Sequence, residues 1–320
     1  MGLCLPSRVM TNEDWAAHVE TSDEWIRART GIRERRLAAE DESTADLAVA
    51  AARHALDDAG LDPKDLDEII VATDTPEVYT PDTASFVQFR LGAREIPSYD
   101  LGGSGCAGFV LALDIARVRA IMGGTRRILV VGVELIMRLL DWTDRRTAVL
   151  FGDAAGAMII GPGAEQGRIL AATAGTDGSQ GDILKLEVGG TRSPVTIERV
   201  RTGAHQHLTM EGRAVFREAV RRMTAAAETV LAEAGLAVED LALVVPHQAN
   251  ARIIEAVRHA LGLPAERVFS NVARLGNTGS ASIPVALWEA RDQGRLQSGD
   301  LVLLTAFGAG FHWSAMLLRW

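Results

Sequence analysis

The chain contains the stretch Gly105-Cys106-Ala107-Gly108-Phe109-Val110-Leu111-Ala112-Leu113, and its second half contains a similar one, Gly279-Ser280-Ala281-Ser282-Ile283-Pro284-Val285-Ala286-Leu287. A second pair of similar segments, residues 60–66 and 235–241, is separated by nearly the same number of residues. Each segment of this second pair follows a helix with apolar periodicity and leads into a buried strand. The two matches predict an α/β fold made of two duplicated halves, 1–162 and 163–320, with mostly parallel sheets covered by helices.

Cys106 lies where a glycine-rich turn becomes an apolar helix, after a short strand that starts near residue 96. The glycines allow a sharp bend that presents a single side chain. Free N–H groups at the start of the helix and the helix dipole favour a thiolate over a thiol. These features predict a nucleophile, although a lone cysteine is more often a small buried core residue.

The composition excludes several classes of protein. The chain has 320 residues and a net charge of −9, whereas a general nucleic-acid binder needs a basic surface. Its two cysteines, Cys4 and Cys106, cannot form a disulfide framework, and no Cys/His cluster has the spacing of metal ligands. We find no signal peptide and no apolar run long enough to cross a bilayer, so we expect a cytoplasmic protein that binds neither nucleic acid nor membrane.

Loops that follow equivalent strands of the two halves should meet near Cys106. In the second half these loops contain His247, Asn277 and the glycine turn 308–310. A cysteine suits acyl transfer, in which backbone N–H groups of Cys106 and of this turn would hold the oxyanion, at about 2.7–4 kcal/mol per donor. His247 and Asn277 both have donors that could hold a second oxyanion, such as an enolate. A structural histidine and a turn asparagine are the ordinary alternatives.

These motifs together resemble the β-ketoacyl-acyl-carrier-protein synthase III family, condensing enzymes of the thiolase superfamily, over essentially the whole chain. The resemblance rests on Thr21-Ser22-Asp23-Glu24-Trp25, Arg29-Thr30-Gly31-Ile32-Arg33, Cys106-Ala107-Gly108-Phe109, Phe151-Gly152-Asp153, Pro246-His247-Gln248-Ala249-Asn250, Gly276-Asn277-Thr278 and Phe307-Gly308-Ala309-Gly310-Phe311.

The resemblance implies a five-layered αβαβα fold, a homodimer and an acyltransferase that works by decarboxylative Claisen condensation. An acyl-CoA primer and malonyl-acyl-carrier protein would give 3-oxoacyl-acyl-carrier protein, CoA and CO2, which starts fatty-acid synthesis without a metal or other cofactor. Cys106 would carry the acyl group, and His247 and Asn277 would stabilise the enolate. Phe307 would shield the thiol, next to the oxyanion and gating residues Gly308, Ala309 and Gly310.

The family also suggests a CoA site and shows three departures in this chain. The adenine would lie between Trp25 and Arg145. The turn before Cys106 is one residue longer than usual, Arg213 replaces a frequent Asn that contacts CoA, and most of the first strand is missing at Met1. The residues expected to bind CoA are Trp25, Arg29, Thr30, Arg145, Asn250 and Arg252.

A row of arginines suggests a docking surface for an acidic carrier protein. Arg213, Arg217 and Arg221 follow helical spacing on one face, and Arg252 and Arg258 add charge. The alternative is an ordinary solvated helix face.

Three other functions fit parts of the sequence. Residues 103–108 have the form G-x-G-x-x-G and Glu134 ends the next strand, as in dinucleotide-binding oxidoreductases, but the strand before the motif is polar. The order Cys, His, Asn resembles papain-like proteases, whose local cysteine signature is absent. The stronger alternative is an enzyme of the same scaffold that serves secondary metabolism or transfers the acyl group to another acceptor.

Overall fold

We describe a computed structural model of the chain, covering residues 1–123, 126–161 and 167–320. The predicted boundary between the halves, at 162 and 163, lies outside the described residues. Among the helices described, none is long and apolar enough to cross a membrane.

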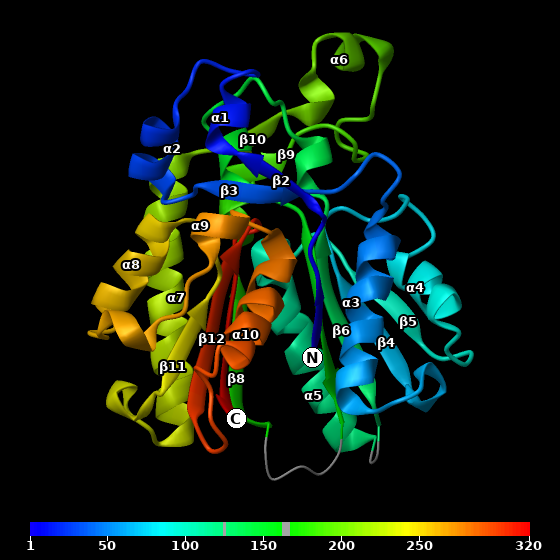
Figure 1. Cartoon of the computed structure of the whole chain (residues 1–320), viewed down its shortest axis with the longest axis vertical. Helices are drawn as coiled ribbons and strands as arrows, with labels where there is room; N and C mark the ends of the chain where they lie inside the picture. Colours follow the sequence, from blue (N-terminus) through cyan, green and yellow to red (C-terminus); the bar gives the residue numbers. More distant parts are fainter. Residues whose placement is uncertain (124–125, 162–166) are drawn as a thin grey trace.

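Two sheets form the framework of the molecule (Figure 1). The first has the strand order β1 (Gly2–Cys4), β7 (Ala154–Ile160), β6 (Ile128–Glu134), β4 (Glu68–Ala72) and β5 (Ser98–Leu101). The second has the order β11 (Leu243–Pro246), β12 (Leu301–Gly308), β13 (His312–Arg319) and β8 (Arg168–Thr176).

The strand pairing of the second sheet repeats that of the first. β4 runs parallel to β6, which pairs antiparallel with β7, and β11, β12 and β13 repeat this pattern. The glycines before the two equivalent strands adopt nearly the same left-handed conformation, with φ of 63° at Gly60 and 66° at Gly235. The duplicated topology predicted from the matching segments is therefore present.

Helices form the other three layers of the predicted five-layered αβαβα fold, which is confirmed (Figure 1). α5 and α10 lie between the sheets, where α5 contacts strands of both. The core of this middle layer joins Val130 of the first sheet to Phe109 of α5 and Leu304 of the second sheet. The layers contain α3 (Thr44–Ala59) and α4 (Thr83–Leu91) outside the first sheet, α5 (Gly108–Met122) and α10 (Ser282–Asp292) between the sheets, and α7 (Gly212–Ala234) and α8 (Ala251–Ala260) outside the second.

Local sequence signals explain where these helices begin and end. The Ser43 side chain accepts the N–H of Asp46 in a capping box at the start of α3, and Gly60 ends that helix. Shorter elements cover the ends of the sheets that carry the site (Figure 1). They are β2 (Arg8–Thr11), α1 (Asn12–Trp15), α2 (Asp23–Thr30), β3 (Glu34–Leu37), β9 (Leu184–Leu186), α6 (Ile197–Arg201), β10 (Leu208–Met210) and α9 (Val272–Leu275).

Candidate active site

The Cys106 turn packs against the glycine turn that follows β12. Cys106 lies in a short 3-10 turn that leads into α5, with Gly105 at a φ of +55°. A Cβ on Gly105 would lie 2.6 Å from the nitrogen of Ala309, and one on Gly308 would lie 2.5 Å from the nitrogen of Cys106. Only glycines allow the two backbones to come so close. The Cys106 N–H therefore lies beside the 308–309 backbone, as an oxyanion hole requires.

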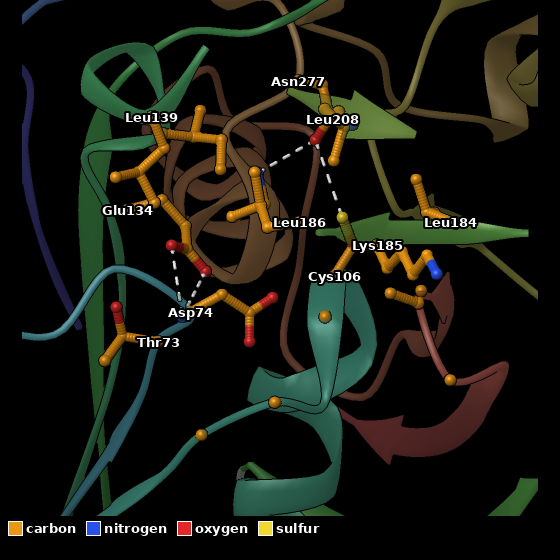
Figure 2. Close-up of a pocket in the computed structure, with 18 of the residues that line it drawn as sticks. Thr73, Asp74, Cys106, Glu134, Leu139, Leu184, Lys185, Leu186, Leu208 and Asn277 are labelled. Carbon is orange, nitrogen blue, oxygen red and sulfur yellow. Dashed lines mark hydrogen bonds between the residues drawn. The ribbon is translucent and has the colours of Figure 1, made fainter. Parts of the chain in front are cut away.

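Asn277 lies on the other side of the thiol (Figure 2). Its Oδ1 atom is 3.9 Å from the Sγ of Cys106 and accepts the N–H of Gly279 at 2.9 Å. This bond orients the carboxamide so that its Nδ2 donor remains, with no acceptor among the described residues. Asn277 and Cys106 line the same cavity, of about 890 Å³, so this donor is available to a ligand.

His247 follows β11 and lines the same cavity. The backbone N–H of His247 donates to the Thr305 carbonyl, and the ring Nδ1 is 2.7 Å from the hydroxyl of Ser282. Burial lowers the pKa of His247 to about 3, so the imidazole is neutral at physiological pH. If the Ser282 hydroxyl donates to Nδ1, the proton of the ring lies on Nε2, where it can bind an oxyanion. Sequence reasoning missed Ser282, although a serine at the start of an apolar helix was a signal.

Phe307 forms a wall of this cavity together with the turn Gly308, Ala309 and Gly310. Its side chain is buried, and its ring centroid is 4.7 Å from that of Phe311. The expected shielding and gating residues thus lie beside the thiol.

The expectation that Cys106 rests as a thiolate is wrong. Burial raises the pKa of the thiol, and the nearby carboxyl groups of Asp74 and Glu134 raise it further. The helix dipole and backbone donors do not offset these effects on the half-buried residue. Cys106 is therefore a thiol at rest, and it must lose its proton when it attacks.

The buried carboxyl group of Glu134 lies beneath the turn that contains Asn277 and Gly279. Its Oε1 is 3.0 Å from the Ser280 hydroxyl and accepts the N–H of Asp74 at 3.1 Å, while its Oε2 accepts the Thr75 hydroxyl at 2.8 Å. Burial and the charge of Asp74 raise the pKa of Glu134 to about 8. Sequence analysis did not single out Asp74, although an acidic residue directly after the buried strand β4 was a signal.

A second cavity, of about 350 Å³, adjoins the first, and every residue expected to bind CoA lines it. The two cavities have wall residues in common, among them Asn250, Leu150 and Ile253. A ligand in the smaller cavity can therefore reach toward Cys106. The expected residues that line it are Trp25, Arg29, Thr30, Arg145, Asn250 and Arg252, and Arg213 lies with them.

Two guanidinium groups lie close to the ring of Trp25. The centre of its ring is 4.3 Å from the guanidinium carbon of Arg29 and 5.0 Å from that of Arg145. Arg145 also donates to the Glu20 carbonyl at 2.7 Å. The expected sandwich of adenine between Trp25 and Arg145 would replace this direct contact, so Arg145 must move when an adenine enters.

Comparisons with known proteins assign the family. The model of the 3-oxoacyl-[acyl-carrier-protein] synthase III family matches residues 99–178, and that of the C-terminal part of the same family matches residues 231–320. A beta-ketoacyl-[acyl-carrier-protein] synthase III of Roseiflexus sp. (strain RS-1) is 47% identical over 319 residues, covering 100% of this chain and 96% of the relative. The chain belongs to the 3-oxoacyl-[acyl-carrier-protein] synthase III family.

Solved structures of synthase III proteins have the same fold. A 3-oxoacyl-[acyl-carrier-protein] synthase III from Aquifex aeolicus VF5 is 42% identical and superimposes with a TM-score of 0.92, covering 100% of this chain and 98% of that one. The priming β-ketosynthase of the R1128 polyketide pathway is 37% identical, with a TM-score of 0.91 and coverage of 99% and 94%.

Membership of the synthase III family leaves no role for the dinucleotide-binding interpretation. That interpretation needed an accessible Glu134 to bind a ribose, and the Glu134 side chain is buried. The papain-like interpretation is wrong as well, because the fold is the thiolase-like one.

The arginines expected to dock the carrier protein do not all lie in equivalent environments. The side chains of Arg217 and Arg221 on α7 are 71% and 54% exposed, and both lie near Glu218. Arg252 lies over the ring of Phe216 at 5.7 Å, and Arg213 is exposed at the mouth of the smaller cavity. Arg258 is only 16% exposed and pairs with Glu255 of its own helix. Arg258 is thus the member least available to a partner.

Proposed function

We propose that this chain condenses an acyl-CoA primer with malonyl-acyl-carrier protein, through an acyl group carried on Cys106. The observation that supports this most directly is that Cys106, His247 and Asn277 line one cavity, which adjoins an arginine-rich cavity. Arginine is well suited to bind the phosphates of CoA. The products are 3-oxoacyl-acyl-carrier protein, CoA and CO2, and the reaction starts fatty-acid synthesis.

In the first half-reaction, the Cys106 sulfur attacks the carbonyl carbon of the acyl thioester. The backbone N–H of Cys106 and that of the adjoining glycine turn hold the oxyanion, and the CoA sulfur leaves with a proton. Phe307 and the turn 308–310 close the cavity around the thioester.

In the second half-reaction, the malonyl group loses CO2 and becomes an enolate. The Nε2–H of a neutral His247 and the Nδ2–H of Asn277 hold the enolate oxygen, and its carbon attacks the acyl group on Cys106. The lowered pKa of His247 keeps the ring neutral, so the donor does not become a cation that holds the malonyl carboxylate in place.

This reaction needs only its two thioester substrates, so we propose no metal or organic cofactor. No group of His, Cys, Asp and Glu in the described residues could hold a metal ion. We also propose that the enzyme is a cytoplasmic homodimer in which each chain consists of the two predicted halves, 1–162 and 163–320. Exposed Tyr79 and Phe89, which are 83% and 81% accessible, are apolar surface that a second subunit could cover.

The test is the intact mass of the protein after brief exposure to a panel of acyl-CoAs. We expect a gain of one acyl group, which is lost in Cys106→Ala. No adduct from any acyl-CoA would contradict the proposal.

A second candidate role is in secondary metabolism, and it is supported by the 37% identity with the polyketide priming enzyme. Release of CO2 from malonyl-carrier by the acylated protein separates condensation from transfer to an oxygen or nitrogen acceptor.

A further inference from the structure

The thiol of Cys106 needs a proton acceptor, and the proposed function leaves this role unassigned. The thiol is protonated at rest, because it is half-buried beside two carboxyl groups. His247 is poorly placed for the role. To hold an enolate it must carry its proton on Nε2, and Ser282 must then donate to Nδ1, which leaves no free lone pair on the ring. A different group has to receive the proton.

Asp74 is the carboxyl group that faces this part of the cavity. It follows the buried strand β4, and it lines the cavity together with Cys106. Figure 2 shows Asp74 between Glu134 and the Cys106 turn, with its carboxyl group directed toward that turn. Within the described residues no side chain donates a hydrogen bond to this carboxyl group. The backbone N–H groups of Gly103 and Gly105, in the turn before Cys106, lower its pKa.

The hydrogen bonds around Glu134 indicate which of the two acids holds a proton. The charge of Asp74 raises the pKa of Glu134, so the two acids are expected to hold one proton between them near neutral pH. The Ser280 hydroxyl has one proton but two possible acceptors, the carbonyl of Gly105 at 3.2 Å and Oε1 of Glu134 at 3.0 Å. Both contacts are satisfied when Glu134 is protonated and donates to Ser280, which donates to Gly105. The ionised partner is then Asp74.

The other charged groups around Asp74 do not remove this role. The titratable groups whose charges interact with Asp74 are Glu134, the Cys106 thiol and the imidazole of His312. Burial raises the pKa of Asp74, whereas the glycine N–H groups and His312 lower it. A carboxylate with a raised pKa is a stronger base than an ordinary aspartate, which suits proton transfer near neutral pH.

We propose that Asp74 is the acid–base residue that accepts the thiol proton of Cys106. This inference rests on the proposed function. The side-chain hydrogen-bond partner of the sulfur among the described residues is Asn277, so Asp74 acts through one water of the cavity that both residues line. As the C–S bond to Cys106 forms, the S–H proton moves through this water to the Asp74 carboxylate. As the bond to the CoA sulfur breaks, the proton moves from Asp74 to that sulfur. In the condensation, Cys106 leaves as a thiolate and recovers a proton from solvent through Asp74, which matches the one proton that the decarboxylative reaction consumes.

The test compares two reactions of Cys106 in Asp74→Asn, with Asp57→Asn as the matched control. Asp57 is exposed on α3 and lines neither cavity. The first reaction is acylation by acetyl-CoA, or by the acyl-CoA that labels the wild type fastest, followed by rapid quenching and intact mass. The second is alkylation by iodoacetamide, which reports the thiolate fraction without needing an acyl substrate.

Acylation should become slower, whereas alkylation should not. Removal of a base should slow acylation by about 10²-fold and remove its rise with pH, while loss of the negative charge should leave alkylation unchanged or faster. Asp57→Asn should change neither reaction more than twofold. Unchanged or faster acylation would overturn the proposal, and so would equal losses in both reactions, which indicate general damage to the site.

Further measurements cover a misfolded variant and a failure of the proposed function. If thermal unfolding shows that Asp74→Asn is not folded, Asp74→Ala with added formate replaces it. Restored acylation then supports proton transfer, and no restoration overturns it. If no acyl-CoA labels the wild type, the proposed function fails. A slower alkylation of Asp74→Asn would then independently contradict the coupling between Asp74 and the thiol.

Discussion

The carboxamide oxygen of Asn277 points at the sulfur of Cys106, 3.9 Å away, while it accepts the N–H of Gly279 at 2.9 Å. The residue is therefore held by its oxygen, and its nitrogen is the part that can serve a ligand. In this orientation the oxygen of Asn277 faces the nucleophile, and the nitrogen is left to bind the enolate.

We predict that Asn277→Asp loses the condensation step more than the acylation step. The carboxylate keeps the acceptor for Gly279, but it replaces the enolate donor by a negative charge. Loss of one oxyanion donor typically costs about 10²–10³-fold in rate. The measurements are CO2 release from malonyl-carrier by the acylated protein and, separately, the rate of acylation. Equal losses in both steps would contradict the assigned role.

Gly308→Ala should strongly slow acylation of Cys106 without unfolding the protein. A Cβ at this position would lie 2.5 Å from the nitrogen of Cys106, so it would push apart the two backbones that form the oxyanion hole. We expect a loss of about 10²-fold or more in acylation rate, measured by intact mass. Gly178→Ala is the control, since a Cβ there meets nothing within 4 Å. A normal acylation rate in Gly308→Ala would show that the oxyanion is held elsewhere.

Much of the fold and of the nucleophile's surroundings could be predicted because the duplicated segments are short and can be recognised in the sequence alone. The segments around Cys106 and Ser280 repeat the same turn and helix, and this repetition carried the prediction that His247 and Asn277 meet the thiol. The protonation of Cys106 could not be predicted in the same way. It depends on how deeply the sulfur is buried and on Asp74 and Glu134, which only the packing of β4 and β6 brings beside it.

The pair Asp74–Glu134 should make the protein less stable as the pH rises above 6.5. The pKa of Glu134 is about 8 in the folded protein, against 4.5 ordinarily, so the folded state binds more protons than the unfolded state between these values. This stability is fully present below pH 4.5 and is lost as the pH rises through 8. His247 acts in the opposite direction, but only below its ordinary pKa of 6.5, where the unfolded state takes up the proton first.

The measurement is the free energy of unfolding in urea at several pH values between 6.5 and 8, for the wild type and Glu134→Gln. The wild type should lose stability relative to the variant, with a slope of up to about 1.4 kcal/mol per pH unit. The glutamine is neutral throughout, so it removes this contribution and leaves those of other groups. Parallel curves for the two proteins would mean that the buried carboxyl pair is not protonated in this range.

Carrier-protein docking is expected to depend on Arg217 and not on Arg258. Arg217 is 71% exposed on α7, whereas Arg258 is 16% exposed and pairs with Glu255. Arg217→Glu should raise the KM for malonyl-carrier about three- to tenfold at low salt, because an exposed basic surface acts by steering an acidic partner. The effect should shrink as salt screens the charges. Acylation by acyl-CoA should be unchanged, since Arg217 lines neither cavity. Arg258→Glu should leave the KM nearly unaltered.

Arg252 is a poor choice for this test, because it also lines the proposed CoA cavity and its loss would affect both substrates. An unchanged KM in Arg217→Glu would mean that the carrier docks on another face.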